Sequence, residues 1–218
     1  NVLNGGGISV TGGNLNLADG FGGGTLLVDG AGSTASAGLL GVGFSGNAGL
    51  ATFSNAGMGS FTSIDVSDST IAGSTGTLNI QSGATVTGTS LEIAPNAFAN
   101  NGTLTITGAG SSLTLSGTNA SAIGAASAST GTLNIQSGGT LSTNSGTTTI
   151  NPTGTVNLAG GTLNVRGVFD NNGTFNFAGG TLDVKTGGNF QSGTSTLTVP
   201  TGATLAINGG FYNSQGNL

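Results

Sequence analysis

The sequence predicts an all-β fold: a right-handed parallel β-solenoid of about nine turns, with two to three short strands in each turn. Three observations predict it. A Gly-Thr opening recurs along the chain, the residues after each opening alternate between apolar and polar side chains, and no segment has the 3.6-residue periodicity of a helix. Units too short to bury their own apolar face must stack about 4.8 Å apart, and parallel crossovers are almost always right-handed.

The repeats indicate a single solenoid domain over residues 1–218. We expect larger turns over residues 24–153, compact turns of 19 to 20 residues over 154–192, and terminal turns over 1–23 and 193–218. The openings, such as GTLLV, GTLNI and GTVNL, begin at Gly24, Gly49, Gly76, Gly102, Gly131, Gly154, Gly173 and, in degenerate form, Gly193.

The two compact turns align without a gap and so predict which side chains stack inside the solenoid. The predicted core stack places Val156 on Phe175, Leu158 on Phe177, Leu163 on Leu182 and Val165 on Val184. The same alignment places Asn157 on Asn176, whose amides would form a hydrogen-bonded ladder. It also places Gly160 on Gly179, at a corner that needs positive φ.

Composition excludes several classes of function. The chain has no His and no Cys, which removes the usual zinc ligands, Ser-His and Cys-His hydrolase sites and disulfides. Its net charge is −5 with only two basic residues, so we expect no nucleic-acid partner. No apolar run approaches the ~20 residues that span a bilayer, so we expect no membrane insertion.

Seven carboxylates remain as candidates for chemistry. Asp65 and Asp68 are the nearest to a pair, but residues three apart on an extended strand face opposite ways, so they converge only if a corner lies between them. Asp29 opens a fragment of a calcium-binding repeat without a stacked partner. We therefore expect no enzyme activity, and we assign no catalytic residue, metal ion or cofactor.

Two further polar features have structural interpretations that we favour. Arg166 and Lys185 lie 19 residues apart, with Asp170 and Asp183 close by, which predicts a small exposed ion-pair cluster. Threonine rows such as Thr103, Thr105 and Thr107, or those at 147–149, are typical of ice-binding solenoids. However, the unequal turn lengths upstream of residue 154 are expected to break a regular lattice, and ice binding stays a minor hypothesis.

The stretch from Gly108 to Ile150, with GTLNIQSGGT at its centre, resembles the repeats of bacterial autotransporter-type passenger domains and related secreted surface proteins. GTLNIQSGATVTGTS, from Gly76 to Ser90, repeats the pattern. The resemblance implies a secreted protein, located outside the cell on a bacterial surface. It carries no catalytic residue. Such passengers are followed by a membrane barrel or a sorting helix, and neither pattern occurs in these 218 residues.

The ends of the predicted solenoid carry no charged residue over 1–18 or 186–218, and the three prolines lie away from both. Uncapped strand edges pair with other chains, and head-to-tail pairing generates a filament. We expect a homopolymer with about 40 Å per subunit. The candidate end-interface residues are Val2, Leu3, Ile8, Val10, Phe190, Leu205, Ile207, Phe211 and Tyr212.

The leading hypothesis is thus an extracellular structural protein, the subunit of a filament or biofilm-matrix fibre. The alternative is a passenger segment of a longer surface adhesin, and a polysaccharide-processing solenoid is a minor alternative. Polysaccharide of the cell surface or matrix is a further candidate partner.

Overall fold

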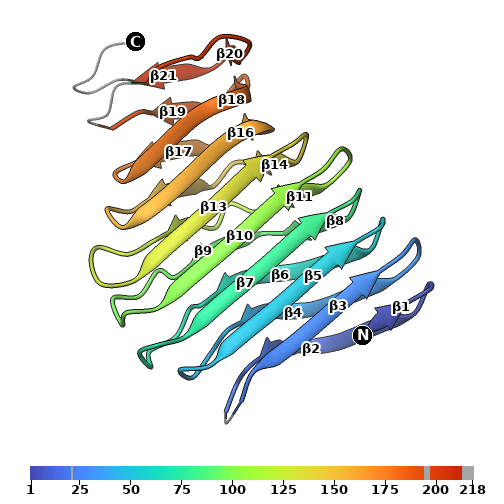
Figure 1. Cartoon of the computed structure of the whole chain (residues 1–218). Helices are drawn as coiled ribbons and strands as arrows, with labels where there is room; N and C mark the ends of the chain where they lie inside the picture. Colours follow the sequence, from blue (N-terminus) through green and yellow to red (C-terminus); the bar gives the residue numbers. More distant parts are fainter. Residues whose placement is uncertain (21, 194–196, 213–218) are drawn as a thin grey trace.

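Every regular element in the described residues, 1–20, 22–193 and 197–212 of the computed structural model, is a β-strand. The strands pair in parallel and coil into a solenoid of about eight turns, close to the nine predicted. In Figure 1 the front strands run from lower left to upper right as the chain climbs from the N-terminus, and the return strands lie behind them. This is a right-handed coil, so the predicted fold class is confirmed.

The turns build three faces, which we call face A, face B and face C. Face A contains β1 (Val2–Leu3), β3 (Gly24–Asp29), β5 (Ala48–Ser54), β7 (Thr75–Gln81), β10 (Asn101–Thr107), β13 (Thr130–Gln136) and the first halves of β16 (Gly154–Val165) and β18 (Thr174–Val184).

Face B begins with the first halves of three long strands that bend onto face C. It contains the first halves of β2 (Gly7–Leu17), β4 (Thr34–Val42) and β6 (Met58–Val66), then β8 (Thr85–Gly88), β11 (Ser112–Leu115), β14 (Thr140–Thr143), the second halves of β16 and β18, and β20 (Thr204–Ile207). Face C contains the second halves of β2, β4 and β6, then β9 (Ser90–Ile93), β12 (Ser121–Ile123), β15 (Thr147–Ile150), β17 (Val168–Asn171), β19 (Asn189–Gln191) and β21 (Gly210–Tyr212).

The glycine that opens each repeat unit stands where the chain enters face A. These glycines pair with one another from Gly24 through Gly154 as one column. A Cβ at Gly76 would lie 2.2 Å from the carbonyl oxygen of Val42, and one at Gly131 would lie 2.2 Å from a backbone nitrogen. The preceding turn passes too close for any side chain, which explains why glycine recurs there.

The two compact turns stack in the predicted register. β16 and β18 pair Val156 with Phe175, Leu158 with Phe177, Leu163 with Leu182 and Val165 with Val184. Asn176 Nδ2 donates to Asn157 Oδ1 at 2.8 Å, so the amide ladder is present. Its next rung down is Asn134, whose Oδ1 accepts from Asn157 Nδ2 at 2.8 Å.

The prediction of which glycine forms the corner is wrong in one of these two turns. Gly160 has φ of 82°, but the residue with positive φ above it is Gly180, at 91°. The ladder shifts register at this corner, so Gly179 pairs with Ala159 in extended backbone. A bulge of this kind adds a residue to one strand locally, and gapless sequence alignment does not reveal it.

One continuous apolar core fills the interior, because inward positions repeat Leu, Val, Ile and Phe from turn to turn. Six of the eight residues of the predicted core stack are fully buried; Phe177 is nearly so, and Phe175 is partly buried against the core. Toward the C-terminal end the core becomes aromatic, with the rings of Phe169 and Phe190 stacked at 5.5 Å.

Candidate functional site

The N-terminal edge of the solenoid is formed by β1 and β2. In the described chain, β2 (Gly7–Leu17) pairs with β4 alone, so its other edge faces outward along the solenoid axis. Of the predicted end-interface residues, Ile8 and Val10 lie in β2 and are partly buried. Leu3 is 44% exposed, whereas Val2 is 5% exposed and belongs to the core.

At the opposite end, β20 and β21 each pair on one side, with β18 and β19, among the described strands. Leu205 and Phe211 are partly buried, and Ile207 is 42% exposed. Phe190 is fully buried with its ring stacked 5.7 Å from that of Phe211, so it belongs to the core and is not an end surface. The side chain of Tyr212 lies outside the described part of the structure.

Three carboxyl groups meet where face C turns toward face A. Asp65 in β6 pairs with Glu92 in β9 on the next turn. Ser67, with φ of 61°, makes the corner that the sequence prediction required for Asp68 to converge with Asp65. Asp68 accepts a hydrogen bond from Asn96 Nδ2, and its carboxyl group shares a hydrogen bond with that of Glu92. We call Asp65, Asp68 and Glu92 the acidic cluster.

Burial is the main cause of the raised pKa values in the acidic cluster. Burial raises the pKa of Asp65 to about 6. A hydrogen bond from Ser63 at 2.6 Å lowers this pKa, and the charge of Asp68 raises it further. The pKa of Glu92 rises to about 7, through burial and then the charges of Asp65 and Asp68. Burial also raises the pKa of Asp68, opposed by its hydrogen bond with Glu92. The cluster therefore exchanges protons near neutral pH.

Glu92 was missed as a member of this cluster by the sequence analysis. The signal was present, because Ile64-Asp65-Val66 and Leu91-Glu92-Ile93 have the same apolar-acidic-apolar pattern on face C of successive turns. Aligning the larger turns as carefully as the compact ones would have stacked the two carboxylates.

No group of three or more His, Cys, Asp and Glu side chains within the described residues has an arrangement that could hold a metal ion. Asp29, the fragment of a calcium repeat, instead accepts hydrogen bonds at Oδ1 from Ser54 Oγ at 2.6 Å and Asn55 Nδ2 at 2.7 Å. Its carboxylate therefore ties β3 to the end of β5.

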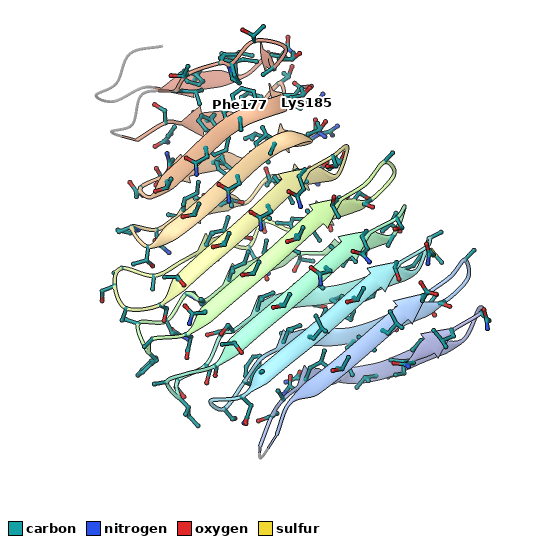
Figure 2. The ribbon with its side chains drawn as sticks, viewed as in Figure 1. Phe177 and Lys185 are labelled. Carbon is teal, nitrogen blue, oxygen red and sulfur yellow. The ribbon has the colours of Figure 1, made fainter. Side chains whose placement is uncertain are left out.

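The predicted ion-pair cluster is smaller than expected. Lys185, at the end of β18 in the C-terminal turns (Figure 2), pairs with Asp183. The backbone nitrogen of Lys185 donates to Val165 on the turn below, which places it beside Arg166 as predicted. Asp170 does not join them, because it lies in β17 on face C and accepts from Asn172 Nδ2 at 3.0 Å.

The threonine rows are more regular than the turn lengths suggested. Face A keeps one register through β7, β10 and β13, which aligns Thr77, Thr103 and Thr132 despite unequal turns. The extra residues of the longer turns lie in corner segments such as 94–100 and 124–129 and leave the strands aligned. The unequal turns therefore do not break the strand register, but no two-dimensional threonine lattice follows, because Thr105 pairs with Asn79 and Asn134.

Comparison with family models, curated proteins and solved structures finds no match to this chain. Among the described residues, no helix has the length and apolar character needed to cross a bilayer.

Proposed function

We propose that this chain is a structural element of an extracellular fibre, which elongates by β-stacking of its solenoid ends. The observation that carries the proposal is the outer edge of β2, which offers an 11-residue strand without a described partner on that side. A strand edge of this length is a template for another chain. Beneath it, Ile8 and Leu15 are partly buried, whereas their column neighbours Ala35 and Leu40 are buried.

The two ends offer complementary columns. Following the strand pairs along face B, the column of Ile8 ends at Leu205 and the column of Val10 passes through Phe61. On face C, the column of Leu15 ends at Phe211. A second copy placed on the C-terminal end in the same register would set Ile8 on Leu205 and Leu15 on Phe211. This contact continues the apolar core and uses different surfaces on the two copies, so it propagates.

A surface adhesin passenger is the second candidate, and the same strand edges support it. Further turns of one longer polypeptide would pair with these strand edges just as a second copy would. The solenoid would then be a rigid spacer that displays an adhesive region. We place either role outside the cell because the repeats resemble those of secreted bacterial surface proteins.

Cysteine pairing tests the stacking directly, because the chain has no cysteine of its own. Positions 9 and 206 end one outward column on face B, so the proposed contact brings them about 4.8 Å apart. That spacing lies within the range of a disulfide. We expect the Ser9→Cys/Ala206→Cys variant to form a ladder of covalent oligomers on oxidation.

The matched control is Ser9→Cys/Thr204→Cys, which moves one thiol two residues along the strand and should give little cross-linking. Electron microscopy of the unmodified chain should show unbranched fibres with an axial repeat of about 40 Å. Short rods of uniform length, without covalent oligomers from either variant, would contradict assembly of copies. A native polypeptide far longer than 218 residues would then favour the adhesin passenger.

A further inference from the structure

Face B is hollowed over the first turns, on β2, β4, β6 and β8. One hollow of about 300 Å³ lies between the outward rows that contain Met58 and Ser60. A second, of about 410 Å³, lies on the other side of Ser60, toward the bend onto face C. The two hollows share Ser36 and Ser60 as lining residues, so they form one open trough.

The trough has a structural cause in the inward residues beneath it. Ala35 and Gly59 occupy the inward column that holds Val86, Leu113 and Leu141 in the following turns. A Cβ at Gly59 would lie 2.9 Å from the rings of both Phe53 and Phe61. The backbone of β6 therefore lies directly on these rings, with no room for an inward side chain at position 59.

The lining combines hydroxyl groups with apolar surface and contains no charged residue. The outward hydroxyl groups that line the two hollows include those of Ser9, Ser36, Ser60, Thr85 and Thr87, and Met58 supplies an exposed apolar side chain. Ser36 Oγ donates to Ser9 Oγ at 3.3 Å, and Thr87 Oγ1 donates to the carbonyl oxygen of Gly59 at 3.3 Å. Both serine oxygens and the Thr87 oxygen keep lone pairs that can accept further hydrogen bonds.

We propose that this trough binds a neutral oligosaccharide. Serine and threonine hydroxyls both donate and accept, as sugar hydroxyls do, so each can pair with either partner. Met58, which is 44% exposed, offers apolar surface to the C–H face of a sugar ring. Both hollows are open to solvent, so the sugar would lie along the surface of the sheet with one side exposed. The lining holds no basic group to pair with an acidic sugar, so the ligand is uncharged.

The trough reaches β2 at the N-terminal end, but it opens on the flank of the solenoid, so sugar binding needs no contact with a second copy. It is tested on the intact 218-residue chain with four hexasaccharides: cellohexaose, chitohexaose, maltohexaose and the acidic hexagalacturonate. Titration calorimetry should detect at least one neutral hexasaccharide with a Kd of about 1 mM or tighter. Hexagalacturonate should bind more weakly than that ligand. Failure of all three neutral probes, or tighter binding of the acidic one, overturns the proposal.

A pair of matched variants locates the binding. Ser36→Ile/Ser60→Ile removes two hydroxyls and fills the trough with side chains that suit a strand, and it should weaken binding about tenfold or more. Thr103→Ile/Thr132→Ile makes the same change on face A and should leave affinity within about twofold. If the double variant on face B fails to fold, Ser60→Ile alone, at an exposed position, serves instead. Equal loss in both variants, or no loss in the trough variant, overturns the assignment to this trough.

Discussion

At the scale of single residues, glycine serves this fold in two ways that sequence alone does not separate. Some glycines are required because the previous turn leaves no room for a Cβ, as at Gly131. Others are required because the corner backbone has positive φ, as at Gly160. Gly180 meets both conditions, with φ of 91° and a neighbouring carbonyl oxygen 2.2 Å from the place of a Cβ. Its neighbour Gly179 meets neither.

Substitution by alanine at these adjacent positions should therefore affect stability very differently. Gly180→Ala should lower the free energy of unfolding by roughly 2 kcal/mol or more, through left-handed strain and contact with the turn below. Gly179→Ala should change it by less than about 0.5 kcal/mol, because the nearest atom lies 3.7 Å from the added Cβ. Thermal melts followed by circular dichroism compare the two. Equal destabilisation would show that the corner bulge is misplaced.

At the scale of elements, strand positions were more predictable than corners. Strict alternation fixed which side chains of β7, β10 and β13 face inward, because a shift of one residue would turn every apolar side chain outward. Corners carry no such pattern. The bulge at Gly179 and the turn at Ser67 that gathers Asp68 depend on local backbone geometry, which the repeat length leaves open. The end residues Val2 and Phe190 were misjudged because neither had been assigned to an inward column.

The acidic cluster between β6 and β9 should make stability depend on pH. The folded-state pKa values of Asp65, about 6, and Glu92, about 7, lie above the values of 3.8 and 4.5 for unburied groups. Between roughly pH 4 and pH 7 the folded chain binds more protons than the unfolded chain, so the free energy of unfolding falls as pH rises. We expect the melting temperature to be higher at pH 4.5 than at pH 7.5.

Removing the charge at one member should flatten this dependence. Glu92→Gln keeps the shape of the side chain and cannot ionise, so the variant should gain stability relative to the parent chain above pH 7 and differ little near pH 4. Asp170→Asn, a change on face C outside the cluster, is the control. A melting temperature that rises from pH 4.5 to pH 7.5 in the parent chain would contradict the proton balance of the cluster.

At the scale of the whole molecule, the solenoid has a direction, because its N-terminal and C-terminal ends present different strands. If copies stack head to tail, each end binds only the opposite end. Ile8→Lys/Leu15→Lys blocks the N-terminal end, since it would bury two unpaired charges in the contact. Ile207→Lys/Phe211→Lys blocks the C-terminal end for the same reason.

Each blocked variant alone should therefore remain monomeric, while an equimolar mixture should form heterodimers through the one intact end of each copy and grow no further. Sedimentation velocity distinguishes the three samples. A small fraction of either variant added to the parent chain should shorten its fibres, because every incorporated copy terminates one end. Homodimers of a single variant would instead indicate a symmetric end-to-end contact, which closes on itself and could not extend a fibre. The mixing experiment thus distinguishes head-to-tail stacking, which extends a fibre, from a symmetric contact, which stops at a dimer.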